Sequence, residues 1–123
     1  MNNLAQLLQD TDSSNNQTRN TAEQQLRDAR DQDPGLFVLR CSEAFKSHQL
    51  SDSLRPKAGI LIKYSLLNSS TGPDALWKSL PPDINQQIKA SLLEASSDPN
   101  EPVRNVAADL ISIIYVIELS WNG

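Results

Sequence analysis

The chain has 123 residues, the length of one ordinary domain, with 11 basic and 15 acidic residues and a net charge of −4. This balance argues against a protein that binds nucleic acid or an anionic membrane, because such surfaces are basic. The single cysteine excludes an internal disulfide and favours a reducing compartment. The amino terminus lacks the basic start of a signal peptide, and polar residues interrupt the most apolar segment, 103–119. We therefore expect a soluble intracellular protein.

Apolar residues recur at helical spacing throughout the sequence, and no segment shows the alternation that predicts a strand. Leu4, Leu7 and Leu8 predict a short first helix. The polar run 11–16 is rich in residues that cap helix amino termini. We expect a second helix to follow this run and to end near Asp31.

Prolines and short polar runs divide the middle of the chain. The turn 33–35 begins a third helix, since proline is tolerated in a first helical turn. The polar run 51–53 offers caps for a fourth helix, with Pro56 in its first turn. A loop is expected over 68–74, followed by a short turn that carries Trp77.

Two further helices are predicted in the last third of the sequence. A fifth begins at 81–83, the proline-containing run 96–102 ends it, and a sixth extends to about Ile117. Six helices with short connections make three antiparallel pairs. The expected divisions are repeat 1 at 1–32, repeat 2 at 33–70, an insertion at 71–80 and repeat 3 at 81–119.

The second helix of each pair carries the same pattern, Arg-x-x-Ala-x-x-x-(Leu/Ile). The alanine allows the paired helices to approach closely, and the apolar residue four positions later shares its face. One copy would be a weak signal, but three copies at the same place in successive pairs predict a solenoid. The expected fold is therefore all-α, a right-handed stack of three helix pairs. The copies are Arg19, Ala22 and Leu26; Arg55, Ala58 and Ile62; and Arg104, Ala107 and Ile111.

The third copy, from Asp98 to Leu110, resembles the HEAT-repeat signature almost position for position. The resemblance implies that the aspartate before the second helix and the arginine within it form a ladder along the stack. Asp52 stands where the ladder aspartate of the second copy is expected, and Asp12 matches that position in the first copy only loosely. We expect the arginines to order the stack rather than to contact a ligand, because a guanidinium group can bridge several acceptors. The expected ladder comprises Arg19, Arg55, Asp98 and Arg104.

Further segments match one family of HEAT proteins, namely TAEQQL at 21–26, AGILIK at 58–63, Trp77 after the polar insertion, NQQIK at 85–89, NVAADLI at 105–111 and IEL at 117–119. Over nearly its whole length the chain resembles the amino-terminal domain of the importin-beta, or karyopherin-β, family of nuclear transport receptors. Its ending is closer to importin beta than to transportins or exportins. Tyr64 departs from the family, which commonly has asparagine there.

The resemblance implies a receptor whose amino-terminal repeats bind the GTP form of the GTPase Ran, chiefly through second helices on the concave face. In that family, cargo or an importin-alpha-type adaptor binds further along the superhelix and is released when Ran binds. The resemblance also implies shuttling between cytoplasm and nucleus through the nuclear pore. The candidate Ran-contacting residues are Lys63, Leu67, Asn105, Asp109 and Ser112.

Each candidate also has an ordinary explanation. Segment 58–67 is apolar on both sides of a helix, so we expect neighbours on both sides and take Lys63 to mark the narrow sector left uncovered. The lysine is otherwise a surface residue whose stem covers Ile60 and Leu67 while its ammonium group stays in water. The polar stripe on the sixth helix is either a contact surface or a solvated face.

No catalytic arrangement is recognisable. His48 is the only histidine and Cys41 the only cysteine, and a site built on them would need a carboxylate partner with no recognisable spacing. No glycine heads a phosphate-binding GK[ST] motif. We expect a binding protein without a cofactor. The rival interpretations are a structural HEAT scaffold, such as a phosphatase or adaptor subunit, and an exportin or transportin relative.

The last predicted helix carries apolar residues beyond its core side, namely Ile111, Tyr115 and Val116. The terminal repeat of a solenoid normally has a polar outer face. We therefore expect an exposed, adhesive side on this helix, which would make the isolated chain self-associate or leave it marginally stable.

Overall fold

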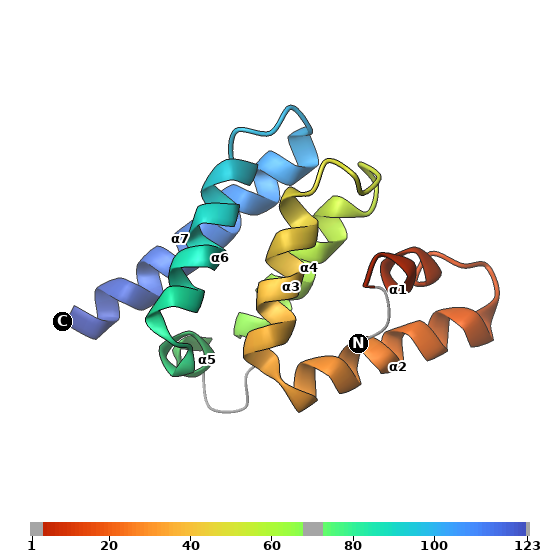
Figure 1. Ribbon diagram of the computed structural model, residues 1–123, viewed down its shortest axis with the longest axis horizontal. Helices are drawn as coiled ribbons and strands as arrows, with labels where there is room; N and C mark the ends of the chain where they lie inside the picture. Colours follow the sequence, from red (N-terminus) through yellow and green to blue (C-terminus); the bar gives the residue numbers. More distant parts are fainter. Residues whose placement is uncertain (1–3, 68–72, 123) are drawn as a thin grey trace.

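The computed structural model describes residues 4–67 and 73–122, and within these ranges it contains seven helices and no strands (Figure 1). The helices are α1 (Leu4–Asp10), α2 (Asn16–Gln32), α3 (Pro34–Lys46), α4 (Arg55–Leu67), α5 (Pro73–Ser79), α6 (Pro82–Ala95) and α7 (Glu101–Asn122). They form three pairs, α1–α2, α3–α4 and α6–α7, with the short α5 between the second pair and the third.

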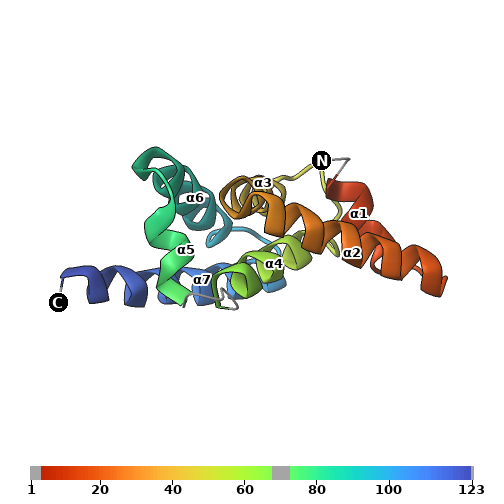
Figure 2. The same ribbon diagram turned by 90° about the horizontal axis from the view of Figure 1, so that it is seen from below.

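The second and third pairs stack in two layers. α3 packs against α6, and α4 packs against α7, so the first helices form one layer and the second helices form the other (Figures 1 and 2). The first pair is attached differently, because α2 packs on α1 and α3 and has little contact with α4. In Figure 1, α2 accordingly extends to the right beyond α4, with α1 beside it. The predicted all-α stack of helix pairs is confirmed.

Three helices begin where the sequence places capping side chains. Asn15 caps α2, Asp33 caps α3 and Asn100 caps α7. In each, a side-chain oxygen accepts a hydrogen bond from the backbone N–H three residues later, at 3.0, 3.1 and 3.2 Å respectively. Each cap satisfies one of the N–H groups that the first turn of a helix leaves unpaired.

The helix count and one boundary differ from the prediction. α5 lies in the segment expected to be an insertion with only a short turn, and it is too short to show periodicity in the sequence. It is held by Trp77, which is fully buried and donates from Nε1 to Oε2 of Glu118 at 3.1 Å. α7 extends to Asn122, beyond the predicted end near Ile117, because no proline or glycine interrupts it. Residues 68–72 of the predicted loop lie outside the described residues, and the repeat boundaries stay predictions.

A single hydrophobic core runs through all three pairs. The alanine and the apolar residue of the repeated pattern are buried in the first two copies. In the third copy, Ala107 is buried but Ile111 is only half-buried, and Leu110 and Ile114 take the inner positions. The largest fully buried apolar side chains include Leu8, Phe45, Ile62, Trp77, Ile88 and Leu110.

Gly59 permits the close approach of α4 to α7. A Cβ atom at this position would lie 2.6 Å from Cγ1 of Val106 and 2.7 Å from Cε1 of Phe45. Neither neighbour yields easily, because valine is β-branched and the phenylalanine ring is fully buried. Contact between the second helices of these two pairs therefore depends on the absence of a side chain at Gly59.

We expect Gly59→Ala to lower the free energy of unfolding by about 1 kcal/mol, because overpacking costs about 1–3 kcal/mol and the gain in helix propensity recovers part of it. Urea denaturation followed by circular dichroism measures this change. The matched control is Gly35→Ala, whose Cβ would meet the flexible end of Leu80, 2.7 Å from Cδ2. That control should stay within about 0.5 kcal/mol of the parent. Equal losses in the two variants would contradict the packing argument.

Candidate protein-binding surface

The outward side of α4 carries a stripe of apolar side chains. Ile60, Tyr64 and Leu67 are 38%, 52% and 40% exposed. The expectation that Lys63 marks a narrow uncovered sector was wrong, since that lysine is half-buried and the uncovered side is wider and mostly apolar. The physical reason is that α3 and α7 cover two sides of α4, whereas α2 leaves the outer side open. Lys63 lies about 40° around the helix from Gly59, on the side that faces α7.

α7 presents a polar stripe beside this apolar one. Asn105, Asp109 and Ser112 are exposed, and Val116 is exposed one turn further along. α4 and α7 pack together in the layer opposite α3 and α6 (Figure 2). Because the side chains of both stripes are exposed, we infer that they lie on the outward side of this layer. We call these seven residues, Ile60, Tyr64, Leu67, Asn105, Asp109, Ser112 and Val116, the second-helix face.

The second-helix face has the composition of a protein-binding patch. Its apolar centre lies on α4, and the polar side chains of α7 form one border. Lys63, at the junction of the two helices, has no ion-pair partner among the residues that the structure describes. Such a patch can bury apolar area and still offer hydrogen-bonding groups to a partner.

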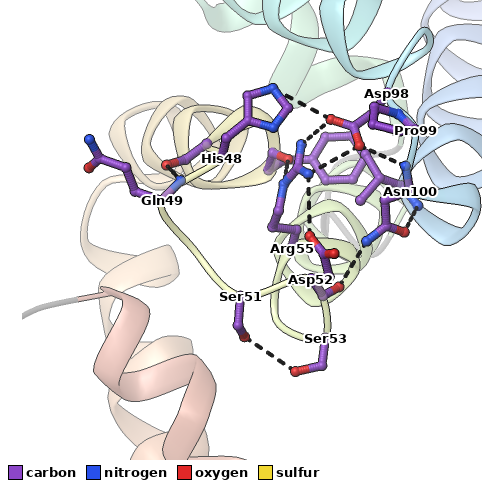
Figure 3. A network of polar contacts seen from close by, with 12 residues as sticks. His48, Gln49, Ser51, Asp52, Ser53, Arg55, Asp98, Pro99 and Asn100 are labelled. Carbon is purple, nitrogen blue, oxygen red and sulfur yellow. Dashed lines mark hydrogen bonds and ion pairs between the residues drawn. The ribbon is translucent and has the colours of Figure 1, made fainter.

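Behind this face, a buried ion pair between Arg55 and Asp98 joins the second pair to the third. Nη1 and Nη2 of Arg55 donate to Oδ1 and Oδ2 of Asp98 at 3.1 and 2.5 Å, and Nε donates to the carbonyl oxygen of Phe45 at 3.1 Å (Figure 3). The two charged side chains are only 2% and 3% exposed. One guanidinium group thus ties together the end of α3, the start of α4 and the loop between α6 and α7.

Asp98 also organises the loop that carries it (Figure 3). Its Oδ1 accepts from the backbone N–H of Asn100 at 2.9 Å, and Nδ2 of Asn100 donates to the carbonyl oxygen of Asp52 at 3.2 Å. Nε2 of the exposed His48 lies 3.8 Å from Oδ2 of Asp98. The hydrogen bonds from Arg55 hold the pKa of the Asp98 carboxyl below its ordinary value, with support from the Asn100 N–H and against the opposing effect of burial.

The arginines of the first and third copies bond within their own pairs. Nη1 of Arg19 donates to the carbonyl oxygen of Ser13 at 3.0 Å, and Nη1 of Arg104 donates to that of Asp98 at 2.9 Å, six residues upstream in both cases. Arg104 also donates to the carbonyl oxygen of Pro99 at 3.0 Å. Among the described residues, therefore, only the arginine of the second copy reaches a neighbouring pair.

A lysine that is absent from the repeated pattern joins the first pair to the second. Nζ of Lys57 donates to Oδ1 of Asp12 and, at 3.2 Å, to Oγ1 of Thr11. Both charged side chains are partly exposed, so this ion pair stabilises the stack only weakly. Asp52, which the sequence offers as the acid of the second copy, is exposed, with Oδ1 3.9 Å from Nη1 of Arg55. The repeated pattern contains no signal that predicts this role of Lys57.

Cys41 and His48, the two residues weighed for catalysis, occupy opposite environments. Burial raises the pKa of the Cys41 thiol to about 12, which keeps it protonated. The side chain of His48 is 70% exposed. Within residues 4–67 and 73–122, no cluster of three His, Cys, Asp or Glu side chains could hold a metal ion, and no helix is long and apolar enough to cross a membrane.

We expect Asp98→Asn to lower the free energy of unfolding by about 3–5 kcal/mol at neutral pH, because the charge of Arg55 stays buried without a counter-ion. The parent should lose the same contribution in acid. A carboxyl whose pKa is depressed by folding stabilises the protein above its unfolded-state pKa of about 3.9, and this stabilisation disappears as the pH falls through the folded-state value. Urea midpoints measured from neutral pH into strong acid test both expectations.

The double variant Arg55→Met with Asp98→Leu separates the buried charge from packing. It should recover much of the lost stability, because apolar side chains of similar size replace the ion pair. Its urea midpoint should also change less with pH in the acid range than that of the parent. An Asp98→Asn variant as stable as the parent would show that the pair does not hold the two repeats together.

A family model described as the importin-beta N-terminal domain matches residues 22–98 of the chain. Among curated proteins, importin subunit beta-1 of Schizosaccharomyces pombe (strain 972 / ATCC 24843) is 26% identical over 124 residues. That alignment covers 98% of this chain and 14% of the Schizosaccharomyces pombe protein. The match thus extends over nearly the whole chain but only a small part of the relative.

Two solved structures are similar in both fold and sequence. Importin beta in an ammonium sulfate condition matches with a TM-score of 0.85 and 26% identity, over 97% of this chain and 14% of its own. The second is a structure of Kap95p, which matches with a TM-score of 0.89 and 26% identity, over 98% of this chain and 15% of the Kap95p chain. That structure is described by the statement that Kap95p binding induces the switch loops of RanGDP to adopt the GTP-bound conformation. The chain therefore spans 14–15% of the length of these relatives. Because the family model covers more than half of the chain, the protein belongs to the importin-beta N-terminal domain family.

Proposed function

We propose that the second-helix face binds a Ran-type GTPase in its GTP form. The observation that carries this proposal is the likeness of the chain to Kap95p, a protein whose binding acts on the switch loops of RanGDP. The exposed apolar stripe on α4 and the adjacent polar stripe on α7 support it, because together they offer a surface that a folded partner can cover.

The chemistry of the face suggests how its parts contribute. The apolar stripe of α4 supplies the area that association removes from water. Asn105 and Ser112 can donate or accept hydrogen bonds, Asp109 offers a carboxylate, and Lys63 offers a cation at the border. Leu67 lies at the end of the apolar stripe and is the one apolar member of the candidate set predicted from sequence.

Selectivity for the GTP form requires that the face bind one switch-loop conformation more tightly than the other, because equal affinity would shift nothing. A surface made from packed helices suits this task, since it does not adapt readily to the other conformation. Kap95p brings the switch loops of RanGDP into the GTP-bound conformation. By analogy, we propose that the GDP form binds this chain more weakly, since rearranging its loops offsets part of the binding free energy.

The wider proposal is a receptor in which GTPase binding is coupled to release of cargo or of an importin-alpha-type adaptor. Such a receptor would shuttle between cytoplasm and nucleus. Family membership supports both statements. We further propose that the chain acts by binding and not by catalysis, since its one cysteine is buried with a protonated thiol and its one histidine is exposed to solvent.

Isothermal titration calorimetry with Ran tests the central proposal, using the GTPase loaded either with a non-hydrolysable GTP analogue or with GDP. We expect the analogue-loaded form to bind at least about tenfold more tightly, which corresponds to about 1.4 kcal/mol. Absence of binding, or equal affinity for the two forms, would remove the proposed function and favour a structural scaffold that binds another protein.

Three charge substitutions locate the contact with the GTPase. Asp109→Lys, in the polar stripe of α7, should weaken GTPase binding about tenfold or more, because it reverses the charge within the face. Glu43→Lys makes the same change at an exposed position of α3, in the other helix layer, and should leave the affinity unaltered. Lys63→Glu tests the cation at the border of the face in the same way, and circular dichroism checks that the helices of this variant remain intact.

We also propose that the chain self-associates through apolar side chains on α6 and α7. Leu93, Tyr115, Val116 and Leu119 are 55–64% exposed, and solvent-exposed apolar side chains in such numbers favour association. Size-exclusion chromatography with light scattering should show a mass that rises with protein concentration. The double variant Tyr115→Lys with Leu119→Lys should shift the chain toward the monomer. A parent chain that stays monomeric at high concentration would contradict this proposal.

A further inference from the structure

A cleft of about 390 Å³ lies between the first and second helix pairs, bounded by α1, α2 and α4. It exists because α2 packs on α1 and α3 and leaves a gap beside α4. The next junction is closed, since Gly59 lets α4 and α7 meet directly. The cleft is therefore a feature of the first junction, and it adjoins the apolar stripe of the second-helix face.

The interior of the cleft is apolar. Leu8, Leu26 and Phe37, which are core residues of the first three helices, form its floor. Ile60 and Tyr64 form the wall on the α4 side, and both are also members of the second-helix face. The volume lies at the lower end of the range of about 300–1,000 Å³ found for ligand pockets, so one large apolar side chain and its neighbours can enter.

The charged residues around the cleft are mainly basic, although the chain as a whole is acidic. Arg27, Arg30 and Lys57 line it together with a single acid, Glu23. Lys57 already pairs with Asp12. The two arginines therefore provide the positive charge that is open to a partner.

Neither arginine is strongly engaged. Nη2 of Arg27 donates to Oε1 of the neutral Gln24 at 2.8 Å, and Nε of Arg30 lies 3.6 Å from Oδ1 of the exposed Asp31. Exposed pairs of this kind are readily exchanged for a better partner. A planar guanidinium group beside an apolar pocket is suited to bind a carboxylate in two places at once.

We propose that this cleft is a socket for a large apolar side chain flanked by carboxylates, presented by the GTPase that the second-helix face binds. The proposal rests on the proposed function, because Ile60 and Tyr64 belong to both surfaces. The apolar side chain covers the exposed parts of these two residues, and the carboxylates pair with Arg27 and Arg30. In this arrangement the partner fills the gap that the packing of α2 leaves open.

A peptide titration followed by two-dimensional NMR tests the chemistry of the socket without any GTPase. The probe is acetyl-Glu-Glu-Leu-Trp-Glu-Glu-amide, and the matched control carries lysine in place of every glutamate. We expect the acidic peptide to shift the amide signals of α2 and α4 residues that line the cleft, and the basic peptide to bind at least tenfold more weakly. Equal binding of the two peptides, or shifts confined to another part of the chain, would overturn the proposal.

Variants then connect the socket to the GTPase. Arg27→Glu should weaken the binding of both the acidic peptide and the analogue-loaded GTPase about tenfold. Arg40→Glu makes the same change at an exposed position of α3 outside the cleft and should leave both affinities unaltered. Tyr64→Ala removes part of the wall and should act in the same direction as Arg27→Glu. Unaltered GTPase affinity in the Arg27→Glu and Tyr64→Ala variants would overturn the assignment of the socket to this partner, while the nucleotide-dependent binding of the parent would still uphold the proposed function.

Discussion

Among the described residues, Arg55 and Asp98 form the one ion pair whose two side chains are both buried, and it constrains how the second and third helix pairs dock. Two charges removed from water are costly unless each finds its counterpart, and here the guanidinium group contacts both carboxylate oxygens and the carbonyl oxygen of Phe45. These bonds form only when the loop between α6 and α7 docks against the start of α4. The pair therefore requires one arrangement of the second and third helix pairs, in which both charges are satisfied. Gly59 complements it by letting α4 and α7 close on each other.

The first pair is joined to the rest by weaker means. Lys57 and Asp12 are partly exposed, and ion pairs of this type contribute about 0–1 kcal/mol, against about 3–5 kcal/mol for breaking a buried pair. α2 packs on α3, from which the single residue Asp33 separates it in the chain, but α2 has little contact with α4. The chain thus combines two tightly stacked pairs with a first pair that leaves an open cleft at its junction.

The functional surface follows from the same packing. In the layer formed by α4 and α7, the inner sides are buried against α3 and α6, and the outer sides have no covering helix among the described residues. The apolar stripe containing Tyr64 consequently remains exposed. Because the helices that carry it are anchored by buried contacts, the stripe is presented as a preformed surface. Such a surface can distinguish between two conformations of a partner, which is the requirement for a nucleotide-dependent interaction.

The helix pairs, their caps and the repeated pattern could be predicted from the sequence, because helical periodicity, proline and capping side chains act over a few residues. The HEAT resemblance placed Arg55 and Asp98 in one expected ladder but did not say that these two residues pair, since 43 residues separate them and only the stacking of the helix pairs brings them together. Tertiary packing also decided that Lys63 of α4 is half-buried while Tyr64, the next residue, is exposed. Periodicity shows which residues share a side of a helix, but the neighbouring helices determine which side is covered. The cleft beside α2 depends entirely on which sides the neighbouring helices cover, and residues distant in the sequence determine this.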